Sequence, residues 1–199
     1  MGLELIGKKI SLVGLESEHL DALATFSTDP EIWKFLSVSL NSKEDIYIWY
    51  EQAKAAEKEG KVIPFVIRDN RTSEIIGSTR LFDVDNRHKT AEIGWTWLNP
   101  KCFGQKINLE AKLLLLTYSF EMMCLNRVQF KTDITNTRSQ KALQKIGAKF
   151  EGILRNHKIR RDGSPGNSMV YSIIISEWPE AKKMIALKLS ENSVNGENN

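Results

Sequence analysis

AEIGWTWLNPKCFGQKINLEAKLLLL, residues 91–116, contains a strand pattern, a loop and a helix pattern in one unbroken segment. The strand ends at Pro100, and the helix begins near Asn108 and is apolar almost all round, which is typical of a helix buried on most sides. A helix N-terminus presents unpaired N–H groups and a positive dipole end, so the loop is a candidate anion site. Gly104 permits close backbone approach, and Lys106 adds positive charge. The alternative is an ordinary strand–helix loop with a helpful glycine.

Two features flank this loop along the chain. Glu92 lies in the apolar strand, where it either points to solvent or places a carboxylate in a cleft as a general base. Gly94 in the same strand indicates a β-bulge or the close approach of another backbone. Asn136 and Ser139 are three residues apart in NTRSQKAL and therefore occupy neighbouring turns of one helix face. They either cap that helix or contact a ligand, and the two roles are compatible.

The remaining elements follow from hydrophobic periodicity and from turn and capping residues. Together they predict a mixed α/β (α+β) fold with a mostly antiparallel sheet of about seven strands and a β-α-β crossover in its second half. The expected strands are residues 8–15, 62–69, 74–84, 89–100, 126–133, 149–159 and 167–176, and the expected helices are 16–29, 42–60, 108–125, 136–148 and a short one from Trp178.

Composition restricts the class of protein. The 199 residues suit one domain with a sizeable core, and the net charge of +3 is too small to indicate a nucleic-acid partner. The longest aliphatic run, residues 113–116, is far shorter than the roughly 20 residues that cross a bilayer. Cys102 and Cys124 lack metal-ligand spacing and are expected to be reduced thiols. We expect a cytoplasmic protein without a metal site or membrane contact, with one domain over 1–188 and a disordered polar tail over 189–199.

Three stretches, FGQKIN, AEIGWTWLNP and NTRSQKALQKIGAKFEGILRNHKIRRDG, resemble the GCN5-related N-acetyltransferase (GNAT) superfamily, and more closely its RimJ/RimL-type ribosomal-protein group. The resemblance covers nearly the whole chain and implies a twisted sheet with helices on both faces and a splay between the fourth and fifth family strands. Asn136, Ser139 and Gly147 stand where the family has Asn, Ser and Gly. Phe103, Lys106 and Asn108 depart from the usual coenzyme A loop, Q/R-x-x-G-x-G/A.

The resemblance implies an acetyl-CoA-dependent N-acetyltransferase that acts on a primary amine, either a protein N-terminus or a small molecule. Glu92 would be the general base, and Ser139 would give a proton or a hydrogen bond to the departing thiolate. Asn136 would hold the cofactor arm. The cofactor is expected to contact Thr96, Trp97, Leu98, Phe103, Gly104, Gln105, Lys106, Ile107, Asn108, Asn136 and Ser139.

The acceptor side is less defined by the sequence. Trp33 and Phe35 are candidates for the wall of the acceptor cleft. His157 and Tyr171 are further candidates for this cleft, and they are reserves for the group that gives a proton or a hydrogen bond to the departing thiolate. The basic cluster at 155–161 is either a solvated hairpin face or a contact for the cofactor 3′-phosphate, an acidic substrate or RNA. A homodimer through an exposed strand edge is compatible with this fold.

Two alternatives stay open at this point. A non-catalytic acyl-CoA-binding or ribosome-associated protein could use the same fold, and the altered loop motivates that alternative. If position 106 has a left-handed backbone, a lysine there costs about 1–2 kcal/mol. Lys106 would then either contact the phosphate or lean away while Gly104 and the helix amides bind it.

Overall fold

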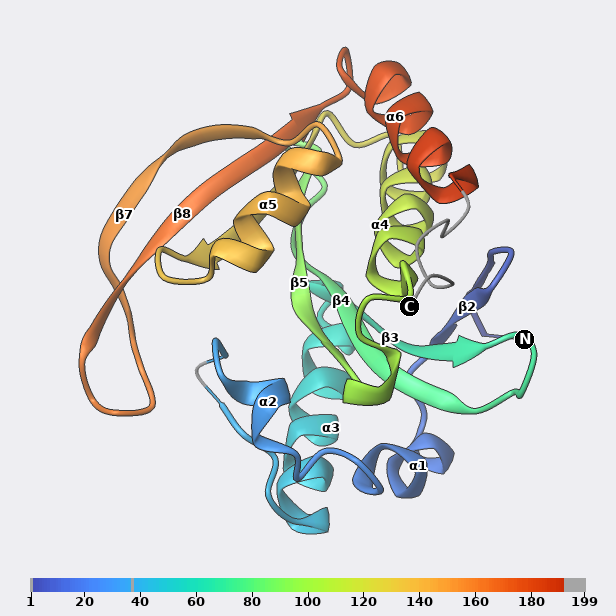
Figure 1. Ribbon diagram of the computed structural model, residues 1–199, viewed down its shortest axis with the longest axis vertical. Helices are drawn as coiled ribbons and strands as arrows, with labels where there is room; N and C mark the ends of the chain where they lie inside the picture. The colour runs from blue at the N-terminus through green and yellow to red at the C-terminus, as the bar shows by residue number, and fades with distance from the viewer. Residues whose placement is uncertain (1, 37, 192–199) are drawn as a thin grey trace, which may run out of the picture.

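Eight strands form one sheet in the computed structural model, which describes residues 2–36 and 38–191. Their order is β1-β2-β3-β4-β5-β6-β8-β7 (Figure 1). Neighbouring strands are antiparallel except for β5 and β6, which are parallel because a helical crossover joins them. The strands are β1 (Glu4–Ile6), β2 (Ile10–Gly14), β3 (Val62–Asp69), β4 (Ile75–Asp85), β5 (Thr90–Leu98), β6 (Arg127–Asp133), β7 (Lys149–Ile159) and β8 (Pro165–Ile174).

Helices cover both faces of this sheet. One apolar core joins the sheet to α4, α5 and α6, and a second core joins it to α1, α2 and α3. Figure 1 shows α4 and α6 side by side in the upper half of the view and α1 to α3 in the lower half. The helices are α1 (Leu20–Ala24), α2 (Pro30–Trp33), α3 (Lys43–Lys58), α4 (Ile107–Thr117), α5 (Thr137–Lys145) and α6 (Trp178–Ser190), with short turns η1 (Ser17–His19), η2 (Pro100–Cys102) and the π-helical η3 (Tyr118–Met122).

The sheet separates between β5 and β6. Their pairing covers three residue pairs, from Thr90 opposite Arg127 to Glu92 opposite Gln129. Beyond Glu92 the two strands diverge, so the β6-facing backbone of the second half of β5 makes no ladder. This divergence is the splay that the sequence resemblance implied.

Three parts of the chain differ from the sequence-based expectation. The short edge strand β1 was not predicted, which accounts for eight strands instead of about seven. The helix expected over 16–29 ends much earlier, at Ala24, and Asp29-Pro30 starts α2 as N-cap and first helical residue. The last helix continues to Ser190, so the first two residues of the expected tail, 189 and 190, are helical. Residues 192–199 of that tail lie outside the described residues.

None of the helices within residues 2–36 and 38–191 has the length and apolar character that spanning a bilayer requires.

Candidate active site

A cavity of about 970 Å³ lies where β5 and β6 diverge. Residues from both sides of the sheet line it. Phe35 and Leu36 come from the segment after α2 on one side, and Ile107 and Leu143 come from α4 and α5 on the other. The cavity therefore passes through the sheet at the splay, and we call it the splay cleft.

The loop before α4 forms one end of the splay cleft. Gly104 has φ +80°, a conformation that glycine adopts without steric cost. Lys106 is also left-handed, at φ +64°, and is the N-cap residue of α4. Its ammonium donates hydrogen bonds to the backbone oxygens of Lys188, 2.7 Å away, and Glu191, at the C-terminal end of α6. Lys106 therefore leans toward α6, and the free amides of the first α4 turn remain at the cleft.

Glu92 is buried at the point where the splay begins, with 4% of its surface exposed. Its Oε2 lies 2.6 Å from the Lys131 ammonium and accepts a hydrogen bond from Gln129 Nε2 at 3.0 Å. Burial raises the pKa of Glu92 above its ordinary value, and the contacts from Lys131 and Gln129 offset this only in part. The solvent-exposed placement that the sequence left open is excluded, and the carboxylate can accept a proton in the cleft.

The N-terminus of α5 forms another wall. Asn136 Oδ1 accepts a hydrogen bond from the Ser139 backbone N–H at 3.0 Å, so Asn136 is the N-cap. Both residues also line the splay cleft, as does Arg138, whose guanidinium lies 5.0 Å from the centre of the Phe103 ring. Asn136 therefore caps α5 and lines the splay cleft at the same time.

A β-bulge interrupts β5 within the cleft. Gly94 pairs with Arg80 and Trp97 pairs with Ser78, so Trp95 and Thr96 together oppose one residue of β4. Trp95 has φ +51°, which is rare for a bulky residue. The sequence pointed to Gly94 for the irregularity, and the bulge lies at the next two residues.

Arg80 is buried beneath this bulge. Its guanidinium lies 4.6 Å from the Trp49 ring centre and 5.2 Å from that of Trp95, and 7% of the residue is exposed. Burial lowers the pKa of Arg80 to about 10, so it stays charged at neutral pH. The two aromatic faces supply the stabilisation that a carboxylate would otherwise give.

Lys112 is a cleft residue that the sequence reasoning missed. It projects from α4, lines the splay cleft and is 9% exposed. Burial lowers the pKa of Lys112 to about 7, and the charge of Glu92 opposes this only in part. The available signal was a lysine within the apolar run of a helix expected to be buried on most sides.

The splay cleft gathers most of the residues expected at the site. Gln105 lies outside, because its side-chain amide donates to the Lys101 oxygen at 2.8 Å and its N–H faces Cys102 O. Trp33 and Tyr171 are core residues with 1% exposure, so neither walls the cleft. The expected residues that do line it are Phe35, Glu92, Thr96, Trp97, Leu98, Phe103, Gly104, Lys106, Ile107, Asn108, Asn136, Ser139 and His157.

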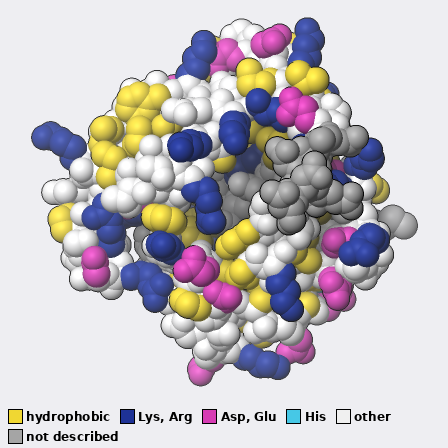
Figure 2. All heavy atoms as spheres, viewed as in Figure 1, with side chains coloured by type: hydrophobic (Ala, Val, Ile, Leu, Met, Phe, Trp, Pro, Cys, Tyr) yellow, Lys and Arg dark blue, Asp and Glu magenta, His cyan; other side chains and the backbone are white. Residues whose placement is uncertain are grey.

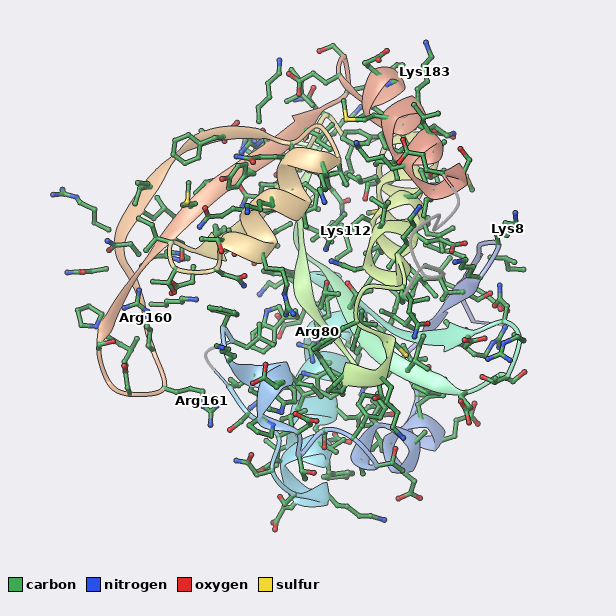
Figure 3. All side chains as sticks on the ribbon, viewed as in Figure 1. Lys8, Arg80, Lys112, Arg160, Arg161 and Lys183 are labelled. Carbon is green, nitrogen blue, oxygen red and sulfur yellow. The ribbon has the colours of Figure 1, made fainter. Side chains whose placement is uncertain are left out.

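In the basic cluster at 155–161, two side chains bind Asp133 and a third is exposed to solvent. Arg160 binds both oxygens of Asp133, at 3.1 and 3.2 Å, and Lys158 lies 3.3 Å from the same carboxylate. Arg161 is exposed on the hairpin (Figure 3). Two of the cations that could have met a phosphate or RNA are therefore engaged with the end of β6.

Positive charge predominates around the splay cleft. Its lining includes more lysine and arginine than aspartate and glutamate. Figure 2 shows several Lys and Arg side chains near the centre of the face that it views. Such a lining favours a polyanionic ligand.

A splayed sheet with a through-going cleft and a buried carboxylate agrees with what comparison with known proteins finds. The acetyltransferase (GNAT) domain model matches residues 9–149. The chain belongs to this family. Its activity is acetyl transfer, as in the N-acetyltransferases that it resembles, and the non-catalytic alternative is not favoured.

Individual relatives agree with this assignment. The N-acetyltransferase p20 of Bacillus licheniformis, itself uncharacterized, is 28% identical over 158 residues, which is 77% of this acetyltransferase and 86% of p20. A T. thermophilus protein classed as an acetyltransferase is 31% identical, with a TM-score of 0.82 over 95% of this chain and 98% of that one. Mycobacterium smegmatis RimJ, solved in complex with CoA-disulfide, shares the fold at 19% identity, with a TM-score of 0.80 over 90% and 88%.

Proposed function

We propose that the splay cleft binds acetyl-CoA and that the protein transfers the acetyl group to a primary amine, with Glu92 as the general base. The observation that carries this proposal is the cleft itself, which passes through the sheet beside a buried carboxylate. The family supplies acetyl-CoA as the donor, since GNAT proteins use it as their cosubstrate.

The residues present fit coenzyme A. The first turn of α4 offers unpaired amides at Ile107 and Asn108 for the pyrophosphate. The buried Asn108 Oδ1 has no partner, and it could accept a hydrogen bond only from a donor group of the cofactor, such as an amide N–H of its arm. The β6-facing backbone of Thr96 and Leu98 is free to pair with the extended pantetheine arm, as an added strand would. Asn136 and Ser139 would contact the arm from α5.

Glu92 would remove a proton from the attacking amine. Alkyl amines are mostly protonated at neutral pH and must be deprotonated before they attack a thioester. A carboxylate with a raised pKa accepts that proton more readily than an ordinary glutamate does. Lys131 and Gln129 hold the carboxylate in place at the wall of the cleft.

The acceptor that we propose is a protein N-terminus or a small primary amine. Solved structures of similar fold include RimL, a ribosomal L7/L12 α-N-protein acetyltransferase, at 19% identity and a TM-score of 0.79. That similarity motivates N-terminal peptides as the first acceptors to try. Cys102 and Cys124 are both free, which agrees with a reducing compartment such as the cytoplasm. A homodimer stays a prediction.

The test is turnover of acetyl-CoA against a panel of N-terminal peptides and small amines, for the protein and for Glu92→Gln. We expect kcat of the variant to fall by roughly 10²–10⁴, since a positioned base contributes about that much. The dissociation constant for acetyl-CoA, measured by calorimetry, should change little. Glu180→Gln on the exposed side of α6 is the matched control. Normal turnover by Glu92→Gln would exclude Glu92 as the base.

A further inference from the structure

Lys112 places a nitrogen between the two strands that separate. Its Nζ lies 3.2 Å from the hydroxyl of Thr96 in β5 and 5.5 Å from the centre of the Phe130 ring in β6. In Figure 3 the side chain lies between α4 and β5, near the middle of the molecule. Thr96 is a bulge residue, and its hydroxyl also contacts that of Thr79 at 2.8 Å. The Lys112 nitrogen therefore lies near both β5 and β6, in the lining of the splay cleft.

No carboxylate in the described part of the chain forms an ion pair with Lys112. The nearby acid, Glu92, is paired with Lys131 from β6, and Glu110 on α4 itself accepts from the backbone N–H groups of Lys8 and Lys9. Asp133 and Arg138, which also line the cleft from β6 and α5, are occupied by Arg160 and the Phe103 ring. A buried lysine without an ion pair is costly, so this arrangement favours a functional role.

We propose that Lys112 is a catalytic residue, the general acid that protonates the departing thiolate of coenzyme A. This inference rests on the proposed function, which places the thioester in the splay cleft. Glu92 takes one proton from the ammonium form of the acceptor, the neutral amine nitrogen bonds to the acetyl carbon, and the carbon–sulfur bond breaks while the nitrogen loses its second proton to water. The ammonium of Lys112 gives its proton to sulfur and becomes a neutral amine, which takes up a proton from water before the next cycle.

The chemistry of the group suits this step. The ammonium of Lys112, with a pKa near 7, is a stronger acid than an ordinary thiol of pKa about 8.5, so proton transfer to the thiolate is downhill. The Ser139 hydroxyl can donate a hydrogen bond, but it cannot give up its proton at neutral pH without forming an alkoxide. A thiolate left unprotonated in a partly apolar cleft would also be costly. Ser139 can therefore orient the sulfur while Lys112 supplies the proton.

Two variants test the proposal. Lys112→Met keeps the length of the side chain and removes both charge and proton, and Lys112→Arg keeps the charge but holds its proton far more tightly. Lys183→Met on the exposed face of α6 is the control. The first readout is independent of turnover: coenzyme A is bound to each protein, and the ultraviolet absorbance of its thiolate is titrated with pH.

Arginine stays charged throughout such a titration, so the thiol pKa of bound coenzyme A should lie about one to three pH units lower in Lys112→Arg than in Lys112→Met. In the unaltered protein and in Lys183→Met the shift should be smaller, because Lys112 loses its own proton near pH 7, before the thiol titrates. If the bound thiol titrates at the same pH in Lys112→Arg and Lys112→Met, the side chain at position 112 does not contact the sulfur and the proposal is wrong.

The pH dependence of kcat gives the second readout. A general acid must be protonated, so kcat of the unaltered protein should fall as pH rises through about 7. That alkaline decline should be absent in Lys112→Met and Lys112→Arg, with kcat lowered roughly 10²-fold or more. An unchanged alkaline decline in Lys112→Arg would also overturn the proposal. By contrast, failure of the unaltered protein to bind coenzyme A at all would reject the proposed function itself.

Discussion

Lys106 occupies a left-handed position where a second glycine is common in related loops. The expected cost of that conformation for a lysine is about 1–2 kcal/mol. The ammonium offsets part of it by hydrogen bonding to the last carbonyl groups of α6, which lack partners within their own helix. Lys106 therefore connects the loop before α4 to the C-terminal end of α6. Its ammonium group already has hydrogen-bond partners there.

Substitutions of Lys106 can show whether its contacts with α6 stabilise the fold independently of any contact with the cofactor. Lys106→Met keeps the strained backbone and loses the contacts to α6, so we expect it to lower the free energy of unfolding by about 1–2 kcal/mol. Lys106→Gly loses the same contacts but relieves the strain, so it should be less destabilised. Urea unfolding measures both effects.

Calorimetry with acetyl-CoA completes this prediction. Because the α4 amides bind the pyrophosphate in our proposal, the dissociation constant for Lys106→Gly should be unchanged or lower. A clear rise in that constant for both variants would instead show that the lysine contacts the phosphate directly.

At the residue scale, the sequence identified candidates but not their partners. Glu92 was recognised as a possible base, yet its burial depends on Lys131 and Gln129 from a strand far along the chain. Trp33, which follows the Asp29-Pro30 break, and Tyr171 were expected at the cleft, but tertiary packing places both in the core. Lys112 was overlooked because its position between two diverging strands is a property of the folded sheet.

Pairing between β4 and β5 requires a glycine at one point. A Cβ added to Gly77 would lie 2.4 Å from the Trp97 backbone oxygen and 2.8 Å from Leu98 Cδ2. Real side chains do not approach backbone so closely, so the strands would have to move apart. The affected backbone of β5 is also the part expected to pair with the cofactor arm.

Gly77→Ala should therefore lower the free energy of unfolding by about 1–3 kcal/mol, the usual cost of overpacking. Gly14→Ala is the matched control, because its added Cβ would be 3.7 Å from the nearest atom, Leu3 O, and it should stay within about 0.5 kcal/mol of the unaltered protein. Chemical denaturation compares the two. Equal stabilities for both variants would contradict the close approach.

The β7–β8 hairpin is joined to the end of β6 through Asp133. Burial alone would raise the pKa of Asp133, but hydrogen bonds from Arg160 and Thr135, together with the charge of Lys158, hold that pKa well below its usual range. A lowered pKa stabilises the folded state at pH values above the ordinary aspartate pKa of about 4. This contribution declines as pH falls below that value.

Asp133→Asn should destabilise the protein by about 1–3 kcal/mol at pH 7, less than a fully buried pair would lose because the Arg160 side chain is partly exposed. The difference from the unaltered protein should begin to shrink below about pH 4. Urea unfolding over a range of pH tests this, with Asp162→Asn in the same hairpin as a control of much smaller effect. A difference that does not depend on pH would contradict the assigned role.

Most elements could be predicted because their signals are local. The helix α3 begins where Ser42 and Asp45 form a capping box, and both residues are visible in the sequence. The prediction for the segment 16–29 was wrong because an Asp-Pro pair can mark either the end of one helix or the start of the next. Here it starts α2, and α1 ends at Ala24. The strand β1 was missed because three residues are too few for a periodic signal.

At the scale of the whole molecule, the splay could not be derived from strand patterns. Which strands pair, and for how many residues, depends on contacts between distant segments, and here three pairs hold β5 to β6. Only the family resemblance implied the gap between these strands. The charge around the cleft and its passage through the sheet emerge only when both helical layers are in place.

A cavity lined from both faces of a sheet also has a consequence for the kinetic mechanism. In the proposed reaction, donor and acceptor can enter from opposite faces and be held at the same time, so the acetyl group moves once, directly between them. No residue has to carry it in a separate half-reaction, and steady-state kinetics should have the form of a ternary complex.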